Sequence, residues 1–84
     1  MKIEIKLFTS RSCSWCPYVE NMLRKIIAAH SIFDLNIIDI EEEIDLAEKY
    51  EIVALPTIIL PSSERVIGCP DEEFLNSRLK IYVN

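Results

Sequence analysis

The 84-residue sequence predicts an α/β protein with the element order β-α-β-α-β-β-α. Three observations predict this class. Apolar and other residues alternate in two short stretches, which indicates strands. A helical pattern of apolar residues lies between those stretches, and two further helical patterns flank a predicted hairpin in the second half of the chain. A chain of this length supports one core, so we expect residues 1–84 to form one domain.

The first three predicted elements form a βαβ unit. Apolar residues alternate over residues 3–7 and predict a strand. From Cys16 onward apolar residues recur at helical spacing, and this helix is expected to end near His30. The stretch FDLNIID (residues 33–39) alternates again. A strand, a helix and a strand of this length predict a parallel, right-handed crossover.

The second half is predicted to contain two helices and a hairpin. The acidic run 41–43 opens a shorter helix, because negative side chains are favoured at a helix N-terminus. The stretches TIIL (57–60) and RVIG (65–68) are separated by the turn-forming PSSE and predict two paired strands. The last helix is expected to begin at Pro70 and Asp71. Its apolar stripe consists of Phe74, Leu75, Leu79 and Tyr82.

Composition narrows the functional classes. A net charge of -5 and a pI near 4.8 argue against a general nucleic-acid binder, which needs a basic face for phosphates. The N-terminal MKIEIKLFTS lacks the continuous apolar core of a signal peptide, and no run is long enough to span a membrane. We therefore expect a cytoplasmic protein without a membrane or nucleic-acid partner, and we expect a monomer because nothing in the sequence suggests an obligate dimer. In that reducing compartment, three cysteines do not predict a structural disulfide scaffold.

The motif CSWC lies where the first strand gives way to the first helix. A helix that starts near Cys13 places its sulfur beside unpaired N–H groups and the positive end of the helix dipole, which stabilises a thiolate. Arg11 adds positive charge nearby. Cys16 lies one turn further along, close enough for a disulfide but less exposed. Pro17 is tolerated in the first turn of a helix. We predict that Cys13 attacks a substrate disulfide and Cys16 resolves the mixed disulfide.

Two other interpretations of the cysteines stay open. Zinc needs four ligands, and the chain offers one pair, a distant Cys69, and His30 about 20 Å from Cys13 along the helix. No metal is therefore expected. The alternative is that both thiols are ordinary small core residues. Cys69 is interpreted as a small residue at the start of the last helix rather than a third redox thiol.

Three motifs in this order carry a resemblance to a known family. CSWC, AEKYEIVALPT (residues 47–57) and IGCPDEEFL (residues 67–75) together resemble the thioredoxin superfamily, particularly the small, glutaredoxin-sized thioredoxins of archaea. The resemblance covers nearly the whole chain. It implies a minimal thioredoxin fold, in which a four-stranded mixed sheet is flanked by three helices. It also implies that the first two strands are parallel neighbours in middle-to-edge positions.

The resemblance also assigns candidate substrate-binding residues. It implies that the Leu55–Pro56 bond is cis, that this loop faces the redox pair, and that the Leu55 backbone binds the substrate chain as an added strand. The alternative is a trans proline that separates a helix from a strand. Gly68 resembles a glycine of the peptide- or glutathione-binding surface, or is a plain turn glycine. Trp15 is expected to be exposed, either anchoring a partner or half-packed on a neighbouring loop.

The function implied by the resemblance is a dithiol-disulfide oxidoreductase that reduces protein disulfides without a cofactor. Its partners are disulfide-containing proteins and an electron donor, either a flavin-dependent reductase or glutathione. A glutathione-dependent glutaredoxin is the first alternative, although Pro70 removes a backbone donor where glutaredoxins hold a glutathione carboxylate. A redox-inactive docking module and a metal-binding adaptor are the others.

Overall fold

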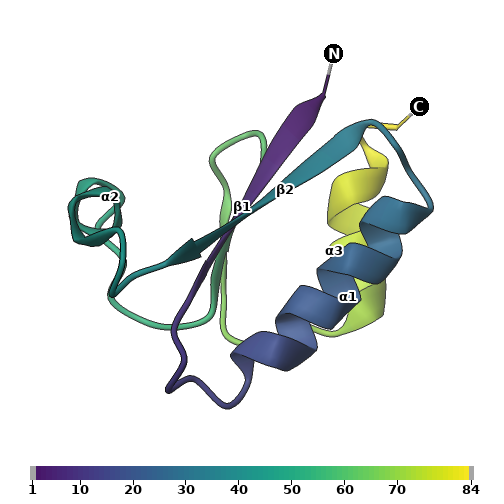
Figure 1. Ribbon diagram of the computed structural model, residues 1–84. Coiled ribbons are helices and arrows are strands. Elements are labelled where there is room, and N and C mark those ends of the chain that lie inside the picture. Colours follow the sequence, from purple (N-terminus) through teal and green to yellow (C-terminus); the bar gives the residue numbers. More distant parts are fainter. Residues whose placement is uncertain (1, 84) are drawn as a thin grey trace.

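The computed structural model describes residues 2–83, with four strands and three helices in the predicted order (Figure 1). The βαβ unit comprises β1 (Ile3–Thr9), α1 (Cys16–Ala28) and β2 (Phe33–Asp39). The remaining elements are α2 (Ile44–Lys49), β3 (Thr57–Ile59), β4 (Arg65–Ile67) and α3 (Glu72–Lys80).

The four strands form one mixed sheet in the order β2-β1-β3-β4. β1 and β2 pair in parallel over their full length, from Ile3 opposite Phe33 to Thr9 opposite Asp39. β3 runs antiparallel to both β1 and β4. The predictions of a mixed four-stranded sheet, of parallel β1 and β2 and of the middle-to-edge order are confirmed.

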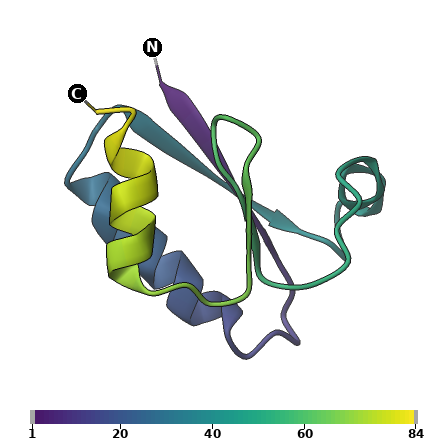
Figure 2. The ribbon, with the colours of Figure 1, turned by 180° about the vertical axis from the view of Figure 1, so that it is seen from behind.

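The helices cover the two faces of the sheet unequally. α1 and α3 lie together on one face, and α2 lies alone on the other (Figures 1 and 2). The larger core lies under α1 and α3; its buried members include Leu7, Leu23 and Leu75. A smaller cluster of Phe8, Ile38 and Ile59 lies on the face of α2. Both faces of β1 are thus covered at its C-terminal end, where Leu7 and Phe8 are both buried.

α1 begins three residues later than the sequence predicted. We expected a start near Cys13, but the first helical residue is Cys16 and Trp15 is the N-cap. The reason is Pro17, which has no N–H to donate to the Cys13 carbonyl. That carbonyl instead accepts a longer bond from the Cys16 N–H, at 3.4 Å. The helix ends at Ala28, close to the predicted His30.

α3 confirms its predicted start and corrects its apolar stripe. Asp71 is the N-cap, and its carboxylate accepts a hydrogen bond from the Phe74 N–H at 2.8 Å. Leu75 and Leu79 are buried as expected. Phe74, however, is exposed, and Tyr82 lies beyond the last helical residue and packs edge-on against Phe33. Only one narrow strip of this short helix therefore contacts the core.

Candidate active site

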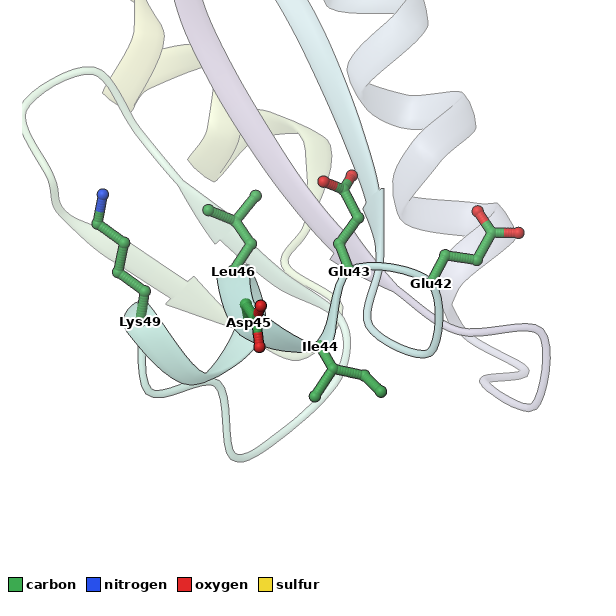
Figure 3. A pocket seen from close by; sticks show the side chains of 6 residues that line it. All are labelled: Glu42, Glu43, Ile44, Asp45, Leu46 and Lys49. Carbon is green, nitrogen blue, oxygen red and sulfur yellow. The ribbon is translucent and has the colours of Figure 1, made fainter.

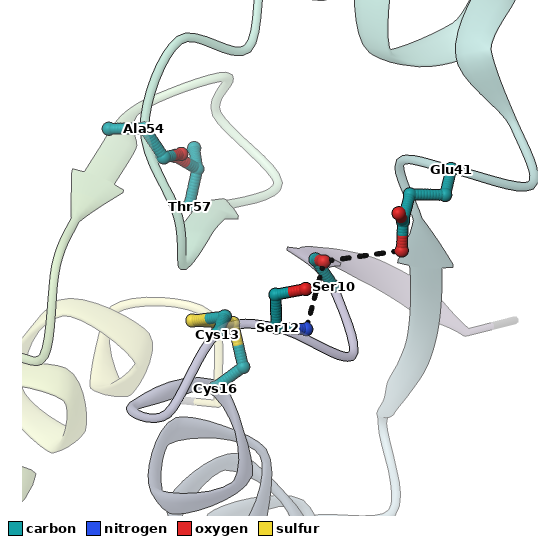
Figure 4. The surroundings of a disulfide bond; sticks show 7 residues. All are labelled: Ser10, Ser12, Cys13, Cys16, Glu41, Ala54 and Thr57. Carbon is teal, nitrogen blue, oxygen red and sulfur yellow. Dashed lines mark hydrogen bonds between the residues drawn. A yellow bond between two sulfur atoms is a disulfide. The ribbon is translucent and has the colours of Figure 1, made fainter.

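Cys13 and Cys16 are joined by a disulfide at the junction between β1 and α1 (Figure 4). Their Cα atoms are 5.4 Å apart. The two residues differ in access to solvent, because Cys16 is 2% exposed within the first turn of α1 whereas Cys13 is only half-buried in the preceding loop. The predicted difference in exposure is confirmed. The bond also holds the Cys13 sulfur at the N-terminal end of α1, although Cys13 itself precedes the helix.

The loop before Cys13 is held by the hydroxyl and the carbonyl of one residue. The Ser10 Oγ accepts a hydrogen bond from the Ser12 N–H at 3.2 Å, and the Ser10 carbonyl accepts one from the Cys13 N–H at 3.1 Å. The same hydroxyl donates to the Glu41 carboxylate at 3.4 Å (Figure 4). The redox loop is therefore connected to the turn before α2.

Arg11 does not act as a free positive charge. Its guanidinium lies 3.6 Å from the Glu42 carboxylate, and both side chains are exposed. The positive charge that Arg11 was expected to add beside Cys13 is thus offset by the carboxylate of Glu42, thirty-one residues further along the sequence. Two of the resolved pKa shifts belong to residues of β1. A hydrogen bond from Lys6 lowers the pKa of Glu4, and the same bond raises the pKa of Lys6.

The loop before β3 has the backbone geometry that the resemblance implied. The Leu55–Pro56 bond is cis, and Pro56 is buried. Thr57 is 1% exposed, and its hydroxyl donates to the Ala54 carbonyl at 2.6 Å, which links the chain on either side of the proline. A trans proline is therefore ruled out as the arrangement in this structure.

Gly68 lies beside the same loop from the other side. Its N–H donates to the Pro56 carbonyl at 2.9 Å. Its φ of +90° is a conformation that side chains rarely adopt, whereas a Cβ there would meet no atom within 4 Å. The backbone conformation, rather than lack of space, therefore selects glycine here. The turn role of Gly68 is established by this geometry, and its role in ligand binding stays a prediction.

A groove of about 540 Å³ opens next to Cys13. It lies between the redox loop and the chain that leads into β3, so it brings together Cys13, Trp15 and Leu55 among the predicted site residues. Pro56 and Gly68 do not line it. Trp15 is 59% exposed, as expected, and its ring lies 5.6 Å from that of Tyr18.

Sequence reasoning missed part of the groove. Ile40, Ile52 and Val53 also line it, and Val53 is 90% exposed. The available signal was the segment EIVALP, which contains more apolar residues than a loop after a short helix needs. Ile52 and Leu55 rest against the smaller core cluster, so the groove wall is supported by the face of the sheet that α2 covers.

The other two candidate metal ligands named from the sequence, His30 and Cys69, are not joined to the cysteine pair. Within residues 2–83, no group of three or more His, Cys, Asp or Glu side chains could hold a metal ion. His30 packs edge-on against Phe33 at the far end of α1, and Cys69 is exposed and forms no disulfide. The metal-binding alternative thus finds no ligand set in that part of the chain. The described helices also include none that is long and apolar enough to cross a bilayer.

Two thiols close enough to bond, one buried and the other facing a groove, are equipped for thiol-disulfide exchange. This arrangement, beside a cis-proline on a four-stranded mixed sheet, defines the protein as a dithiol-disulfide oxidoreductase with a thioredoxin fold.

Comparison with known proteins identifies the family. The family described as "Thioredoxin domain" matches residues 1–80, and the chain therefore belongs to the thioredoxin family. The chain is 30% identical over 80 residues to a thioredoxin of Methanocaldococcus jannaschii, covering 94% of each chain. It is 27% identical over 79 residues to a probable thioredoxin of Archaeoglobus fulgidus, covering 93% of this chain and 87% of the relative.

A solved structure supports the fold. Thioredoxin 1 of Thermosipho africanus superimposes with a TM-score of 0.82 at 18% identity, covering 94% of this chain and 92% of that one. The predicted family, fold and oxidoreductase function are confirmed, and the similarities do not favour the glutaredoxin alternative.

Proposed function

We propose that this member of the thioredoxin family reduces disulfides in protein substrates with Cys13 as the attacking thiol and Cys16 as the resolving thiol. The observation that carries this assignment is the difference in exposure between the two residues. Only the half-buried Cys13 lines the groove, so a substrate sulfur reaches it first.

The proposed reaction has two exchange steps. The Cys13 thiolate attacks one sulfur of the substrate disulfide, which forms a mixed disulfide and releases the other substrate sulfur as a thiolate that takes up a proton. The Cys16 thiol, as its thiolate, then attacks the Cys13 sulfur. The Cys13–Cys16 bond forms and the second substrate thiol leaves. Two electrons pass from the protein to the substrate, and a separate reductant restores the dithiol.

The substrate chain is proposed to lie across the predicted binding residues. Leu55 offers its backbone as one edge of an added strand, with Pro56 fixing that edge, and Trp15 offers an exposed aromatic face on the other side of Cys13. Gly68 supports this surface through its bond to the Pro56 carbonyl. The thiol-bearing loop and the proline loop would thus hold the substrate between them.

The proposed electron donor is a flavin-dependent thioredoxin reductase, with glutathione as the alternative. Pro70 supports the first choice, since it lacks an N–H just before the N-cap of α3, where a glutathione carboxylate would bind. We further propose that residues 1–84 act as one domain, as a monomer, in the cytoplasm. The net charge of -5 supports a monomer that stays dispersed.

The test is reduction of a protein disulfide, such as that of insulin, by chemically reduced protein. Cys13→Ser is expected to abolish reduction, and Cys16→Ser to accumulate a mixed disulfide through Cys13 that mass spectrometry detects. Cys69→Ser is the matched control and should reduce insulin at the wild-type rate, because Cys69 lies outside the disulfide. If neither wild type nor Cys13→Ser reduces insulin, a redox-inactive docking module becomes the better proposal; if both reduce it equally, the role assigned to Cys13 is wrong.

A redox titration separates the two donors. The Cys13–Cys16 equilibrium would be followed by mass spectrometry in dithiothreitol and in glutathione buffers. For a thioredoxin-type reductant we expect a reversible two-electron transition at about -270 mV and no glutathione adduct on Cys13. A stable glutathione adduct on Cys13 would overturn the proposed donor.

A further inference from the structure

The groove beside Cys13 has an apolar wall that the thiol chemistry does not require. Ile40, Ile52 and Leu55 form this wall, and Val53 projects beyond it almost fully exposed. Leaving a large apolar side chain in water is unfavourable unless a partner covers it. The wall therefore indicates that more of a substrate than its disulfide contacts the protein.

The wall continues into an acidic rim. We use this name for Glu41, Glu42, Glu43 and Asp45, which follow Ile40 and lead into α2. Glu41 contacts the Ser10 hydroxyl at 3.4 Å, and Ser10 itself lines the groove. Glu42 contacts Arg11, the neighbour of Ser10, at 3.6 Å. These two contacts fix the acidic rim at the edge of the groove, next to the redox loop.

A second hollow, of about 580 Å³, lies along the acidic rim (Figure 3). Its lining combines Glu42, Glu43 and Asp45 with the apolar Ile44 and Leu46, and Lys49 closes it at the far end of α2. Ile44 is more than half exposed and has no other evident use. A long basic side chain fits this combination, because its aliphatic stem packs on apolar surface while its charged end stays near carboxylates.

The charge on this side is not cancelled. Residues 41–48 contain five carboxylates and no lysine or arginine. Arg11 and Lys49 offset two of these charges; Lys49 lines the second hollow at the C-terminal end of α2, where its ammonium lies 5.9 Å from the centroid of the Tyr50 ring. Arg65 also lies at that end, where it donates to the Tyr50 carbonyl. The end of α2 nearest the groove therefore stays negative.

We propose that the groove and the acidic rim select polypeptide segments that carry a lysine or arginine near the target cysteine. The apolar wall packs against the segment beside that cysteine, and the acidic rim receives the basic side chain. An acidic segment is repelled by the same carboxylates. This proposal rests on the proposed function insofar as the segment belongs to a disulfide substrate, and it names which substrates are preferred.

The test measures binding without redox chemistry. Three peptides would be compared that differ only in a flanking Lys, Gln or Glu and carry serine in place of cysteine. Trp15 is the single tryptophan and lines the groove, so its fluorescence reports occupancy. Amide chemical shifts of residues 40–55 give a second readout. The Lys peptide is expected to bind about tenfold more tightly than the Glu peptide at low ionic strength. This ratio should fall to about twofold in 0.5 M salt.

Two variants test the location of the selective charge. In E41Q/E42Q the Lys-to-Glu ratio is expected to fall to about twofold at low ionic strength. The control variant, D34N/E64Q, removes two negative charges, as E41Q/E42Q does. In each variant one of the two carboxylates forms a salt bridge, Glu42 with Arg11 and Glu64 with Arg78. Asp34 lies on β2 opposite Glu4, near the start of β1 and far from the redox loop. The control should therefore keep the wild-type Lys-to-Glu affinity ratio.

Three results would overturn the proposal. These are equal affinity for the three peptides or no response to any of them, an equal loss of selectivity in the control, and a Trp15 signal that depends on protein concentration alone. The last would show that a second copy occupies the groove. Because the peptides contain no cysteine, selective binding by a protein that fails to reduce insulin would refute the proposed function and leave this inference standing.

Discussion

The two faces of the sheet differ in how extensively helices bury them. The face under α1 and α3 is buried along the sheet by two helices that contribute several fully buried side chains. The face under α2 is apolar only around Phe8, Ile38 and Ile59, and gives way to polar residues such as Glu4, Lys6 and Asn36. α2 itself has no buried residue.

The difference separates stability from binding. The larger core holds the sheet and the two long helices together, and so supplies most of the apolar burial that stabilises the fold. The smaller cluster supports Ile40, Ile52 and Leu55, which line the groove beside Cys13. A lightly covered face under the groove leaves its wall exposed to partners.

The largest expected effect is on the heavily covered face. Leu23→Ala removes a fully buried side chain of α1 and leaves a cavity, so the free energy of unfolding should fall by about 4 kcal/mol. Urea denaturation of the oxidised protein measures this loss. Met22→Ala, at a partly buried neighbouring position, is the control and should cost less. Insulin reduction per folded molecule should be unchanged; a raised KM for the Leu23 variant would break the division between the two faces.

On the lightly covered face, Ile38→Ala should lower the free energy of unfolding by about 2 kcal/mol, because a cavity beneath a single short helix collapses more readily. It should also raise the KM for a peptide disulfide, since Ile52 and Leu55 lose their support. Leu35→Ala, on the opposite face of β2, is the matched control and should affect stability alone. Unchanged KM in the Ile38 variant would show that the groove does not depend on this cluster.

Thr57→Val sharpens the comparison at the junction of the sheet and the groove. Valine keeps the shape of threonine but cannot donate to the Ala54 carbonyl, so the free energy of unfolding should fall by about 1 to 2 kcal/mol. Thr57→Val should also raise the KM for a peptide disulfide. Thr57→Ser retains the hydrogen-bond donor and should have the wild-type KM, although it loses a methyl group. If serine and valine raise KM equally, the hydroxyl is not what holds the loop before Pro56.

The smallest effect concerns the polar part of the α2 face. The hydrogen bond from Lys6 lowers the pKa of Glu4, so this carboxylate contributes stability above its unfolded pKa and loses it as pH falls through the lowered folded pKa. The contribution should stay below about 0.5 kcal/mol, because Glu4 is 44% exposed. Urea denaturation between pH 7 and pH 3 should show this loss in wild type. Glu4→Gln should lack this pH-dependent loss. If the free energy of unfolding varies identically with pH in both proteins, the bond between Lys6 and Glu4 does not stabilise the fold.

Much of the architecture followed from local patterns. The alternation over FDLNIID predicted the bounds of β2, and the motif TIIL-PSSE-RVIG predicted the hairpin. The predicted start of α1 near Cys13 was wrong, because the argument from the helix dipole did not consider that Pro17 has no N–H to donate to the Cys13 carbonyl. Phe74 was wrong because helical spacing alone does not tell which side of a short helix meets a core.

The site was partly predictable from the sequence. The CSWC motif identified Cys13 and Cys16, and the resemblance to thioredoxins implied the cis bond before Pro56. Val53, Ile52 and Ile40 were missed, as were the contacts of Ser10 and Arg11 with the acidic rim. Each of these depends on two segments about thirty or more residues apart, and neither segment carries the signal alone.

The sequence by itself determined the thiol pair, the order of strands and helices, and the acidic character, since each depends on residue identity and short-range spacing. Only the tertiary structure decided which face of the sheet each helix covers and which side chains surround Cys13. It also decided that the groove has an apolar wall and an acidic rim. The parallel pairing of β1 with β2 determines this, because it brings the turn after Asp39 next to the loop after Thr9.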